Sequence, residues 1–169
     1  VPDAMTFAKG LGNGLAIGGV VARGDLMDCL NANSISTFGG NPISTAGAKA
    51  ALDYLLDNDL QANAAKLGSQ LINCLRDVSV ENPVVGDVRG KGLMVGVEMV
   101  GPDGKTPSPA AAARLLEETK SRGLLVGKGG LYNNVIRLAP PLTLTEEETQ
   151  EGLAILTESI TVVDKENQA

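Results

Sequence analysis

One apolar stripe constrains the fold of this chain more than any other feature. Five apolar residues recur at spacings of three and four, namely Leu60, Ala64, Leu67, Leu71 and Leu75. Side chains at these spacings share one face of an α-helix, and an apolar helix face has to be buried against another helix or a sheet. The stripe therefore predicts a core-facing helix that ends at the break formed by residues 81–83, ENP.

The segments before the stripe predict one strand and two helices. The apolar run at 17–22, IGGVVA, is typical of a short buried strand, and residues 23–31 are expected to form a short helix or turn. Asn41 and Pro42 suit the N-cap and the first position of a longer helix. We expect that helix to end near Asn58.

The segments after the stripe alternate between strand and helix. Apolar residues alternate at 92–100, which predicts a strand, and residues 110–122 form a strong helix pattern that stops at Gly123. Short strands are expected at 124–127 and 134–140. This alternation predicts an α/β fold.

The C-terminal segment predicts a last helix. The sequence TEEE at 145–148 is typical of a capping box, and residues 164–169 are expected to fray. With the break after the apolar stripe, the whole pattern predicts two structural units, residues 1–82 and residues 83–169.

The composition argues against several kinds of partner. The formal net charge is −6, the wrong sign for a surface that binds nucleic acid or an anionic membrane. Aromatic residues make up 2% of the chain, so platforms for stacking bases are scarce. No apolar run approaches the roughly 20 residues that span a bilayer. We therefore expect neither a nucleic-acid partner nor a membrane partner.

The histidine and cysteine content limits the chemistry. The chain has no histidine, and Cys29 and Cys74 are far apart and form no CxxC pair. Metal sites and histidine-based catalytic triads are therefore not expected, and two isolated thiols fit a reducing, cytoplasmic compartment. Proton transfer has to depend on Lys, Asp, Glu, Cys or Tyr side chains.

The glycine-rich stretch TFAKGLGNG at residues 6–14 fails as a nucleotide-binding loop. Counted from Gly12 and Gly14, the third glycine of a dinucleotide fingerprint would stand at Ile17. The stretch instead surrounds Lys9 with flexible backbone. A lysine reacts with carbonyl groups only when it is held neutral or already condensed in an enclosed site. The residues alone leave two interpretations open, a reactive amine or an ordinary solvated side chain.

Four segments in order along the chain carry a family resemblance. They are PDAMTFAKGLGNG (2–14), STFGGNP (36–42), GDVRGKGLMVGVE (86–98) and IRLAPPLTLTEEE (136–148). They resemble the C-terminal part of class III aminotransferases, which are pyridoxal 5'-phosphate (PLP) enzymes of fold type I. The resemblance implies that residues 1–82 end the large PLP-binding domain and that residues 83–169 form the small C-terminal α/β domain.

The resemblance also implies roles for single side chains. Lys9 matches the lysine that forms the internal aldimine with PLP and afterwards moves a proton. Thr37, with Ser36 assisting, matches the residue that binds the cofactor phosphate of the partner in a homodimer. Arg137 matches the arginine that binds the substrate carboxylate, which suits a planar guanidinium. The alternatives are a threonine in a local turn and an arginine on an edge strand that reaches solvent. Arg89 is expected to shape a turn or to bind structurally.

The implied reaction moves an amino group from an amino acid, alanine or an ω-amino acid, to glyoxylate or a 2-oxo acid. The alanine–glyoxylate and 4-aminobutyrate types are the most similar. In the family, the acid that pairs with the pyridine nitrogen, the stacking aromatic and the main phosphate-binding loop all precede the lysine. This segment alone is therefore expected to be incomplete and inactive. Two alternatives stay open, an amino-aldehyde mutase of the same family and a cofactor-free α/β interaction module with Lys9 on its surface.

Overall fold

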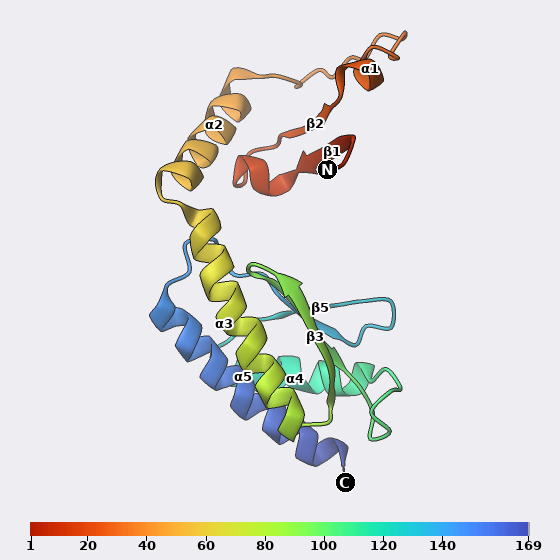
Figure 1. Ribbon diagram of the computed structural model, residues 1–169, viewed down its shortest axis with the longest axis vertical. Helices are drawn as coiled ribbons and strands as arrows, with labels where there is room; N and C mark the ends of the chain where they lie inside the picture. The colour runs from red at the N-terminus through yellow and green to blue at the C-terminus, as the bar shows by residue number, and fades with distance from the viewer. Residues whose placement is uncertain (169) are drawn as a thin grey trace. The chain divides into compact units, whose positions relative to one another are not determined.

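The computed structural model describes residues 1–168 and divides the chain into two compact units, Val1–Asp59 and Leu60–Ala169. Helices and antiparallel strands occur in both units (Figure 1). Within the described residues, no helix combines the length and the apolar character that crossing a membrane requires.

The first unit is a hairpin followed by two helices. Its elements are β1 (Ala4–Ala8), η1 (Lys9–Gly12), β2 (Gly18–Ala22), α1 (Gly24–Met27) and α2 (Pro42–Asp57). Strands β1 and β2 pair antiparallel in a register that sets Ala4 opposite Ala22 and Ala8 opposite Gly18. The short 3-10 helix η1 lies in the loop that joins the two strands.

The start of α2 follows from its capping residues, as predicted. The side chain of Asn41 accepts a hydrogen bond from the backbone N–H of Ser44 at 2.9 Å, and Pro42 occupies the first turn. The Asn41 amide also donates to the carbonyl of Phe38 at 2.9 Å. Asn41 therefore ties the start of the helix to the turn before it, and the helix ends at its C-cap, Asn58.

The second unit places a four-stranded antiparallel sheet against three helices. Its elements are α3 (Leu60–Glu81), β3 (Val85–Lys91), β4 (Met94–Met99), α4 (Pro109–Ser121), β5 (Gly127–Gly129), β6 (Val135–Leu138) and α5 (Glu146–Asn167). The strand order is β3-β4-β6-β5, so β4 and β6 are interior strands. Thr145 and Glu148 form the predicted capping box at the start of α5. The division into domains 1–82 and 83–169 falls between α3 and β3 and stays a prediction.

One face of this sheet packs into the hydrophobic core. The predicted apolar stripe of α3 is buried together with residues of α4 and α5, except for its first residue, Leu60, which is half-buried. The strands contribute alternate residues, among them Val95 and Val97 of β4 and Ile136 of β6. Successive residues of a strand point to opposite faces. Gly96 of β4 and Arg137 of β6 therefore belong to the other face of the sheet.

Four local expectations were wrong. The strand expected to be buried at 17–22 forms as β2, but its residues are mostly exposed. Strand β3 was not predicted, because its sequence VGDVRGK mixes glycines and charges and hides the alternation of a strand. The strand expected at 124–127 begins only at Gly127. The tail that was expected to fray is helical through Asn167. The helix continues because Asp164 is buried there and accepts a hydrogen bond from the backbone N–H of Val84 at 2.8 Å.

One contact between α3 and the sheet leaves no room for a side chain. A Cβ atom built on Gly68 of α3 would lie 2.1 Å from the backbone oxygen of Gly92, in the turn between β3 and β4. Backbone atoms cannot move aside as the end of a flexible side chain can. The helix therefore approaches this turn at a distance that only glycine permits.

Gly68→Ala should destabilise the protein by about 1–3 kcal/mol, because the added methyl forces the helix and the turn apart. Gly152→Ala in α5 is the matched control, since a Cβ there meets no heavy atom within 4 Å. That variant should gain up to about 1 kcal/mol from helix propensity. Urea unfolding of the complete protein, followed by circular dichroism, measures both. A Gly68→Ala variant that unfolds at the wild-type urea concentration would contradict the close approach.

Candidate active site

Lys9 stands at the junction of β1 and η1 with its backbone in the left-handed region, at φ 55°. This conformation costs an L-residue about 1–2 kcal/mol, and such strain is concentrated at functional sites. The side chain is exposed, and its amine makes no ion pair or hydrogen bond with any residue in 1–168. The loop therefore presents a free primary amine at the end of a strand.

The loop after Lys9 is packed tightly. Gly12 is buried, and a Cβ atom on it would lie 2.8 Å from the Cγ2 atom of Ile17. Asn13 is also left-handed, at φ 46°, and its N–H donates to the carbonyl of Gly10 at 3.3 Å. The glycines that suggested a flexible loop therefore build a compact turn around the lysine backbone.

A turn at residues 37–40 precedes α2. Of the two predicted phosphate ligands, Thr37 begins this turn and Ser36 comes directly before it. Within the described part of the chain, the hydroxyls of Ser36 and Thr37 have no hydrogen-bond partner. The nearby hydroxyl of Thr45, in contrast, donates to the carbonyl of Asn41 at 2.9 Å. Both predicted ligands are therefore available for an external acceptor or donor.

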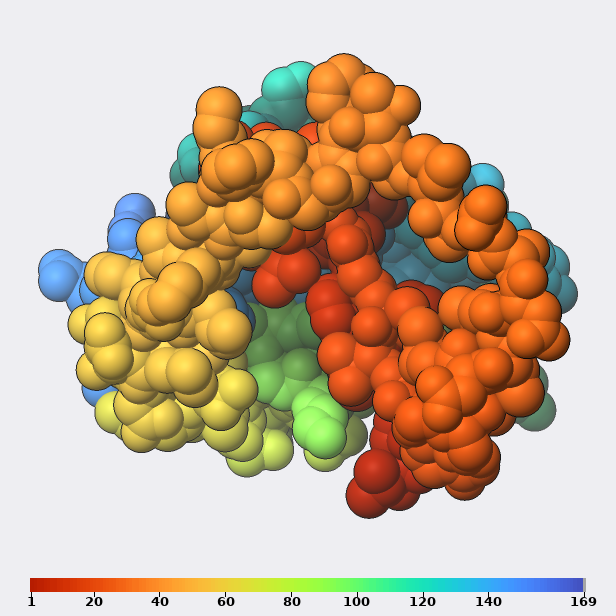
Figure 2. Space-filling view, turned by 90° about the horizontal axis from the view of Figure 1, so that it is seen from above, coloured from red at the N-terminus to blue at the C-terminus, as the bar shows by residue number. Residues whose placement is uncertain are grey.

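A cavity of about 340 Å³ lies beside this turn. Its lining includes Ile17 and Gly18 from the hairpin and Ser36 and Phe38 from the turn. Figure 2 shows the face on which the segment between α1 and α2 (orange) curves past the hairpin (red). Of the predicted residues in this unit, only Ser36 lines the cavity.

Arg137 lies on the interior strand β6 and not on an edge strand, although it is exposed, as the alternative expected. Its directly opposed residues are Gly96 on β4 and Gly127 on β5. The arginine is exposed, and within residues 1–168 its guanidinium has no ion pair or hydrogen bond. The sheet therefore presents an unpaired cation with no side chain on either flank.

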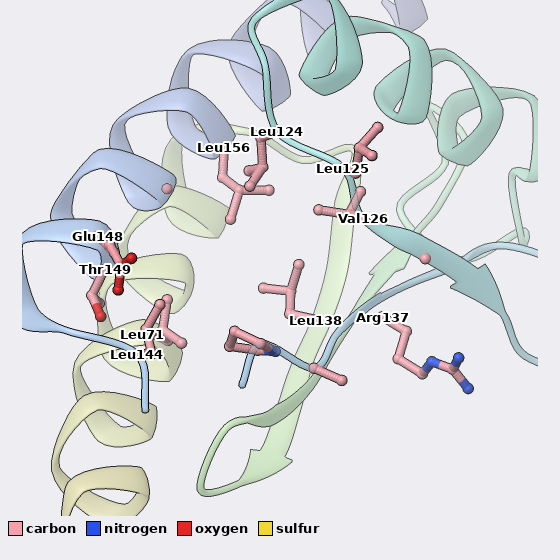
Figure 3. A pocket seen from close by; sticks show the side chains of 14 residues that line it. Leu71, Leu124, Leu125, Val126, Arg137, Leu138, Leu144, Glu148, Thr149 and Leu156 are labelled. Carbon is pink, nitrogen blue, oxygen red and sulfur yellow. The ribbon is translucent and has the colours of Figure 1, made fainter. Parts of the chain in front are cut away.

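A second cavity, of about 310 Å³, begins beside Arg137 and extends between the sheet and the helices. Most of its lining is apolar, including Leu71, Leu138 and Leu156. In Figure 3 the guanidinium of Arg137 points away from Leu138 and Val126. The charged group and the apolar interior of this cavity are thus on different sides of the strand.

Arg89 was expected to shape a turn or to bind structurally, and it lies on β3, where it binds two carboxylates of the sheet. Its Nη1 donates to Asp87 Oδ2 at 2.6 Å and to Glu98 Oε2 at 2.7 Å. These hydrogen bonds, the one to Asp87 first, raise the pKa of the Arg89 guanidinium above its ordinary value. The signal that could have found this pair is the single charge, Glu98, in the alternating run at 92–100.

The predicted residues are divided between the two units. Lys9, Ser36 and Thr37 belong to Val1–Asp59, and Arg137 belongs to the other unit. Among residues 1–168, no three acidic or cysteine side chains are grouped so that they could hold a metal ion. The functional groups that these predicted residues expose are one amine, two hydroxyls and one guanidinium.

Comparison with known proteins decides the family. Residues 1–160 match the family model described as "Aminotransferase class-III". The chain belongs to the class III aminotransferase family. Proteins of this family use PLP, and solved structures of fold type I PLP aminotransferases share the mixed α/β fold of this chain.

Individual relatives of this class III chain have different names and reactions. Alanine–glyoxylate aminotransferase 2 homolog 2, mitochondrial, from Arabidopsis thaliana is 42% identical over 150 residues, 88% of this chain and 31% of that protein. An alanine/serine racemase from Pyrococcus horikoshii is 35% identical and covers 94% of this chain and 33% of its own length.

A solved structure agrees in fold as well as in sequence. The ornithine aminotransferase from Toxoplasma gondii, described with partial occupancy of PLP at its active site, superposes with a TM-score of 0.86 at 32% identity. The match covers 99% of this chain and 39% of that one. The chain thus spans roughly a third of the length of the relatives it matches.

The geometry of the turn before α2 gives a prediction for Asn41. Asn41→Ala removes the cap and should weaken the first turn of the helix by about 1 kcal/mol. Hydrogen–deuterium exchange of the peptide that contains Ser44 should then be faster than in the unchanged protein. Asn41→Asp keeps the acceptor for the Ser44 N–H but loses the donor to Phe38. Its exchange rate should therefore fall between those of the wild type and Asn41→Ala. Equal exchange in all three proteins would show that this cap is not formed.

Proposed function

We propose that this chain contributes the lysine and the carboxylate-binding arginine to a PLP-dependent transaminase. The reaction moves an amino group from an amino acid, alanine or an ω-amino acid, to glyoxylate or a 2-oxo acid. The observation that carries the proposal is Lys9, a strained and unpaired lysine within the class III family match. The name of the Arabidopsis relative supports alanine and glyoxylate as the first substrates to test.

The side chains present fit PLP by their chemistry. The cofactor carries an aldehyde, which a primary amine can bind covalently, and a phosphate, which hydroxyl groups can bind. Lys9 offers the amine, and Ser36 and Thr37 offer hydroxyls that no residue in 1–168 occupies. We assign covalent attachment to Lys9. Phosphate binding is assigned to Thr37 with Ser36, across the interface of a homodimer.

Lys9 also serves as the base in this proposal. When bound, PLP supplies an electron sink for the bonds of the substrate amino carbon. The free amine of Lys9 would take the proton from that carbon and later donate it to a different atom. The chain has no histidine for this task.

Arg137 binds the substrate carboxylate in this proposal. A guanidinium offers two parallel N–H donors to a carboxylate and stays charged at every relevant pH. The glycines opposite Arg137 on both sides leave its face of the sheet open to a ligand. Two parallel hydrogen bonds to the carboxylate would hold the amino acid in one orientation.

A racemase is the second candidate, because one relative of similar identity carries that name. Both reactions begin with removal of a proton from the amino carbon. They differ in where a proton returns, to another atom in transamination and to the same carbon in racemisation. Conversion of glyoxylate to glycine with alanine as donor supports transamination. Loss of optical activity from alanine without an acceptor supports racemisation.

Lys9→Ala in the complete protein should abolish the visible absorbance of lysine-bound PLP and both reactions. Borohydride reduction followed by mass spectrometry should place the cofactor on the peptide that contains Lys9, which tests attachment apart from activity. Lys49→Ala is the matched control, since Lys49 lies in the same unit and pairs with Asp53 at 2.5 Å. Cofactor attached to a peptide without Lys9 would refute the assignment.

Arg137→Ala should raise the KM for alanine about 10- to 100-fold, because hydrogen bonds between charged groups are each worth about 1.5–3 kcal/mol. Arg137→Lys should recover part of this loss, since it keeps the charge and loses the bidentate geometry. Isopropylamine, in which a methyl replaces the carboxylate of alanine, serves as the control donor. An equal loss with both donors would show that Arg137 does not act through the carboxylate.

A further inference from the structure

Arg89, Gly96 and Arg137 stand in one row across the sheet of the second unit. The register sets Arg89 of β3 opposite Gly96 of β4, and Gly96 opposite Arg137 of β6. Directly opposed residues of antiparallel strands share a face. Gly96 therefore places no side chain of its own between the two arginines on the face of the sheet that lies away from the core, and the nearest atom to a Cβ built there is Cγ1 of Val135, at 3.3 Å.

Glu98 is a diagonal neighbour of both arginines. It stands two residues beyond Gly96 on β4 and so points to the same face. Its opposed residues on β3 and β6 each stand two residues from an arginine, Arg89 on one side and Arg137 on the other. Diagonal neighbours are about 7–8 Å apart, within reach of long side chains. Either arginine could therefore bind the same carboxylate.

The carboxylate of Glu98 is held on the β3 side. Arg89 Nη1 donates to Glu98 Oε2 at 2.7 Å and also binds Asp87 at 2.6 Å. The other carboxylate oxygen, Oε1, lies 3.4 Å from the amide nitrogen of Asn134. Within residues 1–168, Arg137 has no acidic partner. Asp87 and Glu98, the two acidic side chains named on this face, are therefore both paired with Arg89.

We propose that Arg89 is a positioning residue for Arg137, which holds Glu98 and so keeps the guanidinium of Arg137 free for the carboxylate of the substrate. This inference rests on the proposed function, in which Arg137 binds that carboxylate. Without Arg89, Glu98 pairs with Arg137, and the substrate has to displace an internal carboxylate. Exposed ion pairs are weak, so we expect the loss of Arg89 to raise the half-saturating substrate concentration only about two- to five-fold.

The half-reaction of the complete, PLP-loaded protein tests this directly. Alanine is added without an acceptor, and the rate of change of the cofactor absorbance is followed against alanine concentration. Arg89→Met should raise the half-saturating concentration about two- to five-fold and leave the maximal rate unchanged. In the same Arg89→Met variant, the half-saturating concentration of isopropylamine should stay at the wild-type value. Glu98→Gln added to Arg89→Met should restore the wild-type value for alanine, because the competing charge is gone.

Matched variants separate this effect from a general loss of structure. Arg114→Met also removes an arginine with two acidic partners, Glu118 and Glu166, but on the helices α4 and α5. It should leave the alanine response unchanged. Arg89→Lys keeps a cation beside Glu98 and should stay near wild type, and Arg89→Gln replaces Arg89→Met if the latter does not fold. A wild-type alanine response in the neutral Arg89 variant, or no recovery in the double variant, overturns the proposal.

Arg137→Ala in the same assay distinguishes the two proposals. An unchanged alanine response in Arg137→Ala refutes the role of Arg137 and, with it, the inference on Arg89. A weakened response in Arg137→Ala together with a normal response in Arg89→Met refutes the inference on Arg89 alone.

Discussion

Burial of one face of the β3-β4-β6-β5 sheet is the constraint on which the second unit depends. Val95, Val97 and Ile136 alternate into the core with α3, α4 and α5. A strand alternates with a period of two, so a slip of one residue would turn Arg137 into that core. An unpaired guanidinium there would be far more costly than any gain from the slip. The position of Arg137 on the other face is therefore fixed by the apolar residues beside it.

The features that could be predicted from the sequence are those set by neighbours along the chain. The stripe of α3, the Asn41 cap and the Thr145 capping box depend on residues within one or two helical turns, and all three were confirmed. Strand β3 was missed because a strand of glycines and charges is recognised only by its pairing with β4. The interior position of β6 and the Arg89–Glu98 pair depend on strand order and register. Neither can be read from a single segment.

The two proposed reactions make different demands on this chain. Racemisation removes a proton from one side of the amino carbon and returns a proton to the other side, so proton donors or acceptors have to reach both sides. Transamination can use a single amine that takes the proton from carbon and delivers it to another atom on the same side. In the proposal, Lys9 of the AKG segment is the single amine that transamination needs.

The carboxylate recognition that we propose for Arg137 would depend on the glycines beside the arginine as much as on the arginine itself. Arg89, Arg137, Asp87 and Glu98 together are neutral, yet both acids pair with Arg89, so the charge of Arg137 is left uncompensated at one end of the row. The opposed glycines, Gly96 and Gly127, keep any side chain from covering that charge. A Cβ atom on Gly127 would meet Arg137 Nε at 3.8 Å, an ordinary contact. A methyl there is sterically acceptable, whereas a longer side chain would lie over the guanidinium and compete with the ligand.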